Sequence, residues 1–342
     1  MSDIAHRKTE HLDLCRDGEV ESGADSGLSR YRLVYRALPE LDLADVDLRT
    51  RIAGKTLRAP LIIGAMTGGT DEARRVNRIL AQGAQLRGIG LALGSARIVL
   101  ERPESASSFE VRDVAPDVLL FANLGAVQLN RGITGDDAAR LVELLGADAL
   151  NLHLNPLQEA IQPEGDTCFR GLGERMAEAI PRIPVPVFVK EVGAGIGPET
   201  AALLACLPLA GVETAGVGGT SWARIEALRQ RDPKAWAAGM ALAGFGVPTA
   251  ESVLACREAF PDRTVIASGG LRTPVEMATC LALGADAVAA ALPFLKAASE
   301  GLDALLAAID AMVHTLRILC FVTGARTPVE LRGRVAAVDR SR

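Results

Sequence analysis

Residues 144–159, with the sequence LLGADALNLHLNPLQE, run from the end of a helical pattern through a tight turn and a short strand into a polar loop. The five residues LGADA at 145–149 recur at 283–287, again between the end of a helical pattern and the start of a strand. A glycine that terminates a helix and a tight turn after it account for both copies. The repeat indicates a chain of alternating helices and strands.

Eight short apolar segments extend this alternation along the chain. They lie at residues 61–63, 89–93, 118–122, 149–153, 187–190, 211–214, 264–268 and 287–290. Runs of this kind are typical of parallel strands that are buried on both faces. Helical patterns lie between them, at residues 71–86, 136–145, 198–207, 248–259 and 274–283. Eight strands, each followed by a helix, predict a (β/α)8 TIM barrel of the α/β class.

A doubly wound parallel sheet is the competing fold. It is disfavoured because MTGG (66–69) follows the first strand, where such a sheet carries G-x-G-x-x-G. Residues 1–59 are predicted to be an N-terminal extension that packs on the barrel, and residues 60–342 to be the barrel with a C-terminal helix. The segment 216–246, after the sixth strand, is too long for an ordinary connection and holds both tryptophans. We expect it to be an insertion over the active site.

Composition excludes several classes of protein. Of the 342 residues, 49% are hydrophobic, 4% aromatic and 23% charged, and the charge sum is 37 − 42 = −5. This much aliphatic residue with so little net charge is incompatible with disorder. Without a basic excess to neutralise phosphates, the chain is a poor general binder of nucleic acid. We therefore expect a folded protein whose partners are small molecules.

Signals for export or membrane insertion are missing from the sequence. The first ten residues, MSDIAHRKTE, are too polar for a signal peptide. The uncharged stretch 235–250 is shorter than the roughly 20 residues that a span needs, and glycines and a proline interrupt it. The six cysteines are scattered without a C-x-x-C pair. These features predict a reduced cytoplasmic protein without a membrane span.

Two glycine-rich segments follow predicted strands six and seven. They read GGTS (218–221) and SGGLR (268–272). Barrels of this type hold phosphate close to this position, where glycine lets backbone amides approach the oxygens and hydroxyl or guanidinium groups complete the shell. A phosphate site is the favoured interpretation, and ordinary glycine-rich turns are the alternative.

Lys190 ends the apolar run PVPVFVK (184–190). A lysine at the tip of a buried strand is desolvated unless it meets an anion. From spacing alone, Schiff-base chemistry and electrostatic support of an electron-rich ring are equally favoured. A plain salt bridge to Glu191 or to another acid is the third interpretation.

The segment HLNPLQE (153–159) places four polar side chains in seven residues. Four scattered histidines are too few for zinc, whereas a lone glutamate with oxygen neighbours suits Mg²⁺ if a diphosphate supplies the other ligands. A solvated loop is the alternative. HRKTEH (6–11) is a small basic cluster that would ordinarily be a solvated arm, and Arg97 is a further candidate for binding an anion.

Seven motifs in this order resemble those of the type 2, FMN-dependent isopentenyl diphosphate isomerases, over essentially the whole chain. They are RKTEH (7–11), AMTGG (65–69), NLG (123–125), HLNPLQE (153–159), KEVG (190–193), GGTSW (218–222) and SGGLR (268–272). Any one motif would be weak evidence. The resemblance implies a TIM barrel that holds FMN at its C-terminal mouth.

The resemblance also assigns roles to individual residues. It implies that Gln158, Lys190 and His153 are catalytic and that Glu159 binds Mg²⁺. FMN would contact Ala65, Met66, Thr67, Ser95, Asn123, Lys190, Thr220, Gly270, Leu271, Arg272, Ala291 and Leu292. The diphosphate substrate would contact Arg7, Lys8, Ser95, Ala96, Arg97, His153, Asn155 and Gln158.

The implied reaction is the interconversion of isopentenyl and dimethylallyl diphosphate, a 1,3-proton shift. Reduced FMN would act as acid and base, NADPH would be the reductant, and the protein would be a homotetramer or homooctamer. The chain departs from the family pattern at Ala96, where Gln is usual, Gly197, where Ser is common, Glu213, often Asp, and Phe245, where Trp is familiar. These departures bear on substrate contacts and leave the flavin and Mg²⁺ residues intact.

Two other functions are weighed against this one. An FMN oxidoreductase of the hydroxy-acid oxidase or IMP dehydrogenase type would need a catalytic His or Cys at a strand end, where only His153 qualifies. A non-catalytic flavin- or phosphate-binding barrel is disfavoured because Arg7, Lys8, Gln158, Glu159 and Lys190 are present together.

Overall fold

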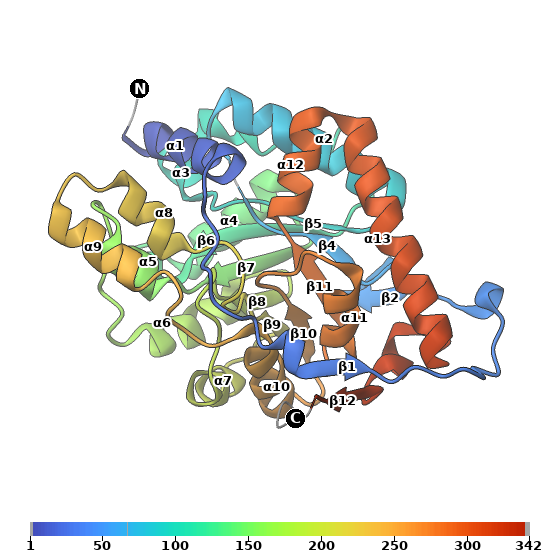
Figure 1. Cartoon of the computed structure of the whole chain (residues 1–342). Helices are drawn as coiled ribbons and strands as arrows, with labels where there is room; N and C mark the ends of the chain where they lie inside the picture. The colour runs from blue at the N-terminus through green and yellow to red at the C-terminus, as the bar shows by residue number, and fades with distance from the viewer. Residues whose placement is uncertain (1–2, 67, 339–342) are drawn as a thin grey trace.

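A closed barrel of eight parallel strands forms the centre of the molecule (Figure 1). The computed structural model describes residues 3–66 and 68–338. The strands, in their order around the barrel, are β4 (Leu61–Ile63), β5 (Gly90–Ala92), β6 (Leu120–Gly125), β7 (Ala149–His153), β8 (Val187–Lys190), β9 (Gly211–Glu213), β10 (Thr264–Ala267) and β11 (Ala287–Ala290). β11 pairs with β4 and closes the barrel. The predicted fold class is confirmed.

Helices surround the barrel and cover its ends. They are α1 (Asp3–Asp17), α2 (Asp71–Arg87), α3 (Arg97–Glu101), α4 (Gly135–Leu145), α5 (Pro156–Ile161), α6 (Leu172–Ala179), α7 (Pro198–Ala205), α8 (Trp222–Arg229), α9 (Pro233–Ala241), α10 (Thr249–Ala259), α11 (Pro274–Ala282), α12 (Leu292–Glu300) and α13 (Leu302–Thr323). Local sequence determines where several of these helices begin and end. Thr134 and Asp137 form a capping box at the start of α4, and Gly146 ends it in the left-handed conformation.

The repeated LGADA segment has the same structural role in both places. Asp148 Oδ2 accepts a hydrogen bond from Arg112 Nη2 at 2.6 Å and from a backbone amide of β6. Asp286 Oδ2 likewise accepts from Arg257 Nη2 at 2.5 Å and from a backbone amide of β10. Each aspartate therefore fixes the turn before its own strand to the preceding strand of the barrel.

Alternation along the strands decides which side chains face the barrel axis. Phe121 and Phe188 belong to the apolar cluster inside the barrel, and their rings meet edge to face with centroids 5.3 Å apart. Asn123 and Lys190 lie two residues further along the same strands, so they share this interior face one layer higher. His153 is in register with Lys190, and Lys190 with Glu213. The top layer of the barrel interior is therefore polar.

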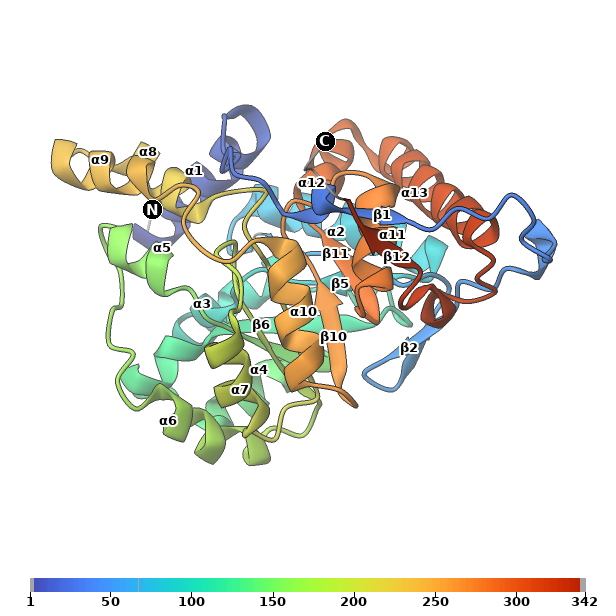
Figure 2. The ribbon, with the colours of Figure 1, turned by 60° about the horizontal axis from the view of Figure 1, so that its bottom comes forward.

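The N-terminal residues contact both ends of the barrel. The hairpin β2 (Thr50–Ile52) and β3 (Lys55–Leu57) places Ile52 and Leu57 in the interior apolar cluster. β1 (Tyr31–Leu33) pairs antiparallel with β12 (Val335–Ala337), as Figure 2 shows. At the opposite end, α1 packs on α8 and α12. The segment after β9 that was expected as an insertion contains α8 and α9.

Helix α13 runs along the outside of the barrel against α2, α11 and α12 (Figure 1). Its 22 residues are apolar enough to cross a membrane by length and composition alone, and 22% of its most apolar window is buried. Among the described residues no other helix meets that criterion. The same length and composition occur in core helices of soluble proteins, so the absence of a membrane span stays a prediction.

Candidate functional site

A cavity of about 250 Å³ opens where the barrel strands end, with α1 over part of it. Almost all of the predicted site residues line it: Arg7, Lys8, Ala65, Met66, Ser95, Arg97, Asn123, His153, Asn155, Gln158, Glu159, Lys190, Thr220, Gly270, Leu271, Arg272, Ala291 and Leu292. Thr67 lies outside the described residues. Ala96 is fully buried and is not part of the lining, and its backbone N–H donates to the Asn123 carbonyl.

The end of the cavity after β10 and β11 is built mainly from backbone; we call it the backbone-lined end, and its residues are Thr220, Gly269, Gly270, Ala291 and Leu292. Gly270 has φ +71°, and a Cβ there would lie 2.3 Å from the Gly218 carbonyl oxygen. Helix α12 starts at Leu292, so its unpaired first amides and positive dipole end lie at this point. Such an arrangement fits a phosphate group.

Arg272, at the rim of this end, is held by the N-terminal extension. Its Nη2 lies 2.7 Å from Glu21 Oε1. Residue 21 also forms an isolated bridge with Thr220. The residues before the barrel therefore hold the rim of the predicted phosphate site in place.

Lys190 is buried at the top of β8. Its Nζ donates to the Glu191 carbonyl at 2.6 Å and forms an ion pair with Glu213 Oε1 at 3.4 Å. Ser268 Oγ donates to the same Glu213 oxygen at 2.8 Å. The salt-bridge partner is thus Glu213. The Glu191 carboxylate instead accepts the backbone amides of residues 192–195.

His153 stands beside Lys190 in the polar top layer. Its Nδ1 lies 2.8 Å from Asn123 Oδ1. Burial, together with the charges of Lys190 and Arg97, lowers the pKa of His153 to about 3. The imidazole is therefore neutral near pH 7, which makes it a hydrogen-bonding group and a poor general acid or base.

The opposite end of the cavity carries charged side chains; we call it the cationic end, and its residues are Arg7, Lys8, Arg97 and Glu159. Lys8 Nζ donates to the Ser95 carbonyl at 2.8 Å and lies 5.0 Å from the centroid of the Phe109 ring. Burial and the neighbouring Arg7 and Arg97 lower the pKa of Lys8 to about 7. Three cationic side chains around one cavity suit a polyanionic ligand.

Glu159 lies at the start of helix α5 and is held from two sides. Asn155 Nδ2 donates to Glu159 Oε1 at 2.7 Å, and the Asp166 amide donates to Oε2 at 2.6 Å. Burial raises the pKa of Glu159. No group of three or more potential metal-binding side chains occurs in residues 3–66 and 68–338. A metal at Glu159 would therefore depend on ligand oxygens, as expected for Mg²⁺ on a phosphate.

Asn155 has an unused polar atom at the cavity. Its Oδ1 is buried and has no hydrogen-bond partner among the residues that the structure describes. Its Nδ2 is shared between Gln158 and Glu159. A buried unpaired acceptor is costly unless a water or a ligand group meets it, so this residue of the cavity lining has an acceptor still to be satisfied.

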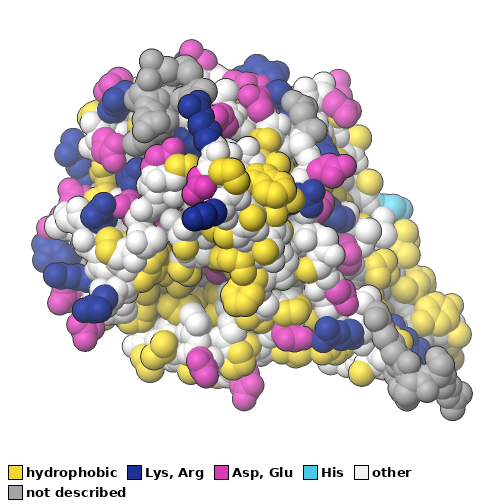
Figure 3. All heavy atoms as spheres, turned by 60° about the vertical axis from the view of Figure 1, so that its left-hand side comes forward, with side chains coloured by type: hydrophobic (Ala, Val, Ile, Leu, Met, Phe, Trp, Pro, Cys, Tyr) yellow, Lys and Arg dark blue, Asp and Glu magenta, His cyan; other side chains and the backbone are white. Residues whose placement is uncertain are grey.

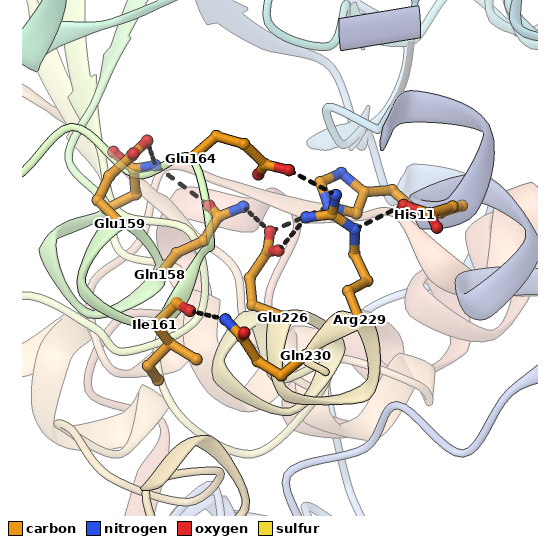
Figure 4. Close-up of polar contacts among 10 residues, drawn as sticks. His11, Gln158, Glu159, Ile161, Glu164, Glu226, Arg229 and Gln230 are labelled. Carbon is orange, nitrogen blue, oxygen red and sulfur yellow. Dashed lines mark hydrogen bonds and ion pairs between the residues drawn. The ribbon is translucent and has the colours of Figure 1, made fainter. Parts of the chain in front are cut away.

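Sequence reasoning missed Glu226, the centre of a buried network in helix α8 (Figure 4). Its Oε1 accepts from Gln158 Nε2 and lies near His11 Nε2, both at 2.9 Å. Its Oε2 pairs with Arg229 Nη1 at 2.6 Å. Burial raises the pKa of Glu226, but His11, Gln158 and Arg229 outweigh this, so the net pKa is lowered and the carboxylate is ionised.

The network ties the N-terminal helix to the insertion after β9. Arg229 Nε pairs with Glu10 of α1 at 2.9 Å and its Nη2 with Glu164 at 3.3 Å. With its amide turned to satisfy both neighbours, Gln162 donates to Glu226 and accepts from Arg7 Nη1 at 2.9 Å. Nothing in WARIEALR (222–229) singles out Glu226, because two arginines and one glutamate in eight residues are equally typical of a solvent-exposed helix.

Several known proteins similar in sequence carry the same name. The chain is 48% identical over 332 residues to isopentenyl-diphosphate delta-isomerase of Synechococcus sp., covering 97% of this chain and 95% of that protein. It is 44% identical to the protein of that name from Mycolicibacterium vanbaalenii (97% and 96% covered) and 42% identical to that from Deinococcus radiodurans (96% and 97%). No family model matches the chain.

Solved structures with a similar fold are more distant in sequence. Mandelate oxidase with 3,3-difluoro-2-hydroxy-3-phenylpropionic acid superposes with a TM-score of 0.67 at 18% identity, covering 98% of each chain. A mutant flavocytochrome b2 with benzoylformate gives a TM-score of 0.66 at 18% identity, covering 98% of this chain and 79% of that one. At this identity the likeness shows the barrel fold.

Proposed function

The chain belongs to the isopentenyl-diphosphate delta-isomerase family, as its relatives show and as its motifs led us to expect. We propose that it interconverts isopentenyl and dimethylallyl diphosphate by a 1,3-proton shift. The observation that carries this proposal is one cavity with two anion-binding ends. The backbone-lined end suits a cofactor phosphate, and the cationic end suits a substrate diphosphate.

FMN is the proposed cofactor at the backbone-lined end. Its phosphate would lie against Thr220, Gly270, Leu271, Arg272 and the start of α12, and its ring near Ala65, Met66, Ser95, Asn123 and Lys190. When bound and reduced by NADPH, FMN would supply the acid and base group of the reaction. Lys190 would place a positive charge near the ring and would stabilise its anionic reduced form.

The diphosphate would be bound at the cationic end. Arg7, Lys8 and Arg97 would contact its oxygens, and Glu159 would hold Mg²⁺ against them. Asn155 fixes Glu159 through Nδ2, and its own Oδ1 is buried without a partner among the described residues. These residues anchor the substrate by its non-reacting part, which orients the hydrocarbon tail toward the barrel axis.

Gln158 is the proposed contact to the reacting carbon atoms. Its Oε1 accepts from Asn155 Nδ2 at 3.1 Å and its Nε2 donates to Glu226 at 2.9 Å, so both ends of the amide are held in one orientation. His153, neutral and held by Asn123, completes the substrate wall as a hydrogen-bonding group.

The protein is further proposed to be a cytoplasmic homotetramer or homooctamer. Figure 3 brings forward the side of the molecule on which α9 lies, where apolar side chains gather between charged ones. On α9 and just after it, Trp236 is 46% exposed and Phe245 64% exposed. Exposed aromatic side chains of this kind support association of copies. Size-exclusion chromatography with light scattering measures the number of subunits.

An anaerobic assay tests the proposed reaction. Purified protein with FMN, NADPH and Mg²⁺ is expected to convert isopentenyl diphosphate to dimethylallyl diphosphate, followed by NMR of the products. Absence of conversion by flavin-loaded protein contradicts the proposal. Oxidation of a 2-hydroxy acid with bleaching of the flavin would instead support the oxidoreductase alternative.

A further inference from the structure

We propose that Asp166 is a positioning residue that fixes Arg97 for diphosphate binding and, through its backbone, fixes Glu159 beside it. This inference rests on the proposed function and extends it to a residue that does not line the cavity. Arg97 and Gln128 line both the cavity and a neighbouring outer groove, and Asp166 lines only the groove. Asp166 therefore acts from behind the residues that meet the ligand.

The carboxylate of Asp166 joins three side chains. Its Oδ2 accepts from Arg97 Nη1 at 3.2 Å and from Gln128 Nε2 at 3.0 Å. Its Oδ1 pairs with Arg131 Nη2 at 2.8 Å. The Asp166 side chain is 14% exposed and that of Arg97 23%, so their contact is largely shielded from water, whereas Arg131 is 58% exposed. Two cations keep the carboxylate charge compensated.

Arg97 is held at two of its three nitrogens. Its Nε pairs with Glu101 at 3.3 Å and its Nη1 with Asp166. The guanidinium has five N–H donors, and these two ion pairs engage Nε and Nη1. Asp166 and Glu101 thus fix the plane of the group and leave donors for a diphosphate, which lowers the entropy lost when the ligand binds.

The backbone of residue 166 makes the second link. Its amide donates to Glu159 Oε2 at 2.6 Å. The turn that brings it there is narrow, because a Cβ on Gly165 would lie 1.8 Å from the Glu159 carbonyl oxygen. Only glycine fits at that approach. One turn therefore sets the spacing between the proposed Mg²⁺ carboxylate and the proposed diphosphate arginine.

The test compares wild-type protein with Asp166→Ala, Asp166→Asn and a control, Asp136→Ala, which removes an exposed partner of Arg182. Inorganic pyrophosphate binding is measured by calorimetry with and without Mg²⁺, and kcat and KM are measured for isopentenyl diphosphate. Thermal melting identifies any variant that is not folded.

Asp166→Ala is expected to raise the pyrophosphate Kd and the KM by about ten-fold, which is the effect expected when hydrogen bonds to a charged group are lost. The kcat is expected to stay within about three-fold, because the lost contacts bind the substrate and the transition state equally. Asp166→Asn, which keeps one acceptor, should recover part of the affinity, and the control should match wild type. If Asp166 had a purely structural role, its loss would lower stability without raising Kd and KM at an unchanged kcat.

Unchanged pyrophosphate affinity in Asp166→Ala overturns the proposal, because Asp166 would then contribute nothing to binding. Higher affinity overturns it too, because Asp166 would then only repel the ligand. If folded Asp166→Ala loses kcat with an unchanged KM, the proposal is also wrong. The binding arm is independent of turnover. Wild-type protein that binds pyrophosphate but does not isomerise the substrate would contradict the proposed function, while the comparison of affinities still decides the role of Asp166.

Discussion

The backbone-lined end and the cationic end of the cavity use opposite means to bind an anion. At the first, glycines and the start of α12 present main-chain amides that nearby sequence places. At the second, long side chains arrive from α1, α3 and α5, which are far apart in the chain. A backbone site is rigid but tolerates no Cβ, whereas a side-chain site tolerates substitution but depends on what holds each charge.

The largest effect is expected at Lys190, between the two ends. Lys190→Met leaves the Glu213 carboxylate buried without its cation, which should cost about 3–5 kcal/mol of unfolding free energy. Isomerase kcat should fall by at least about a hundred-fold, which is the effect expected when a fixed charge that stabilises the transition state is removed. Chemical denaturation and the anaerobic assay measure the two effects.

The double variant Lys190→Met with Glu213→Gln separates stability from chemistry. Removing both charges should restore most of the unfolding free energy, because no carboxylate is then left uncompensated. Activity should stay low, because the positive charge beside the flavin is still missing. Recovery of activity in the double variant would mean that Lys190 has a structural role only.

Gly270→Ala tests the rigidity of the backbone-lined end. The new Cβ would meet the Gly218 carbonyl at 2.3 Å in a left-handed conformation. Strain of about 1–3 kcal/mol should weaken FMN binding by about five- to 150-fold. Quenching of flavin fluorescence on titration measures the affinity. Gly132→Ala, at a glycine of positive φ with open space around it, is the matched control.

Lys8 makes the cationic end dependent on pH. Because its pKa is lowered to about 7, the free protein holds Lys8 partly deprotonated at pH 7–8, and a bound anion favours the protonated form. Binding of pyrophosphate should therefore take up a proton, and affinity should fall by up to about ten-fold per pH unit as pH rises above about 7.

Calorimetry in buffers of different ionisation enthalpy measures this proton uptake. Lys8→Met is the comparison, since pyrophosphate itself also titrates and that contribution is common to both proteins. Equal proton uptake by the wild-type protein and Lys8→Met would show that Lys8 does not change its charge on binding.

The smallest effect is expected at Glu10, which links α1 to Arg229. Glu10 is 37% exposed, so Glu10→Gln should change stability by no more than about 1 kcal/mol. Because α1 carries Arg7 and Lys8, KM should still rise slightly while kcat is unchanged. Steady-state kinetics and limited proteolysis of α1 measure this. A large fall in kcat would show that α1 contributes to the chemical step.

Much of the fold and of the site's location is predictable from local sequence. Apolar runs between turn signals locate the barrel strands, and four of them, such as Ala149–His153, are placed with correct ends. The polar residues that end β7, β8 and β9 are predictable because alternation and strand direction place them at one mouth of a barrel. The partners of those residues are not predictable in this way.

Sequence alone determined the barrel, the position of its mouth and the two glycine-rich loops there, because each depends on neighbouring residues and on backbone conformation. Only the tertiary structure decided that Lys190 pairs with Glu213 and not with the adjacent Glu191. It also decided that Glu226 joins Gln158 to α1, and that Asp166 stands behind Arg97. These contacts depend on strand register and helix packing, which bring together charges that are distant in the chain.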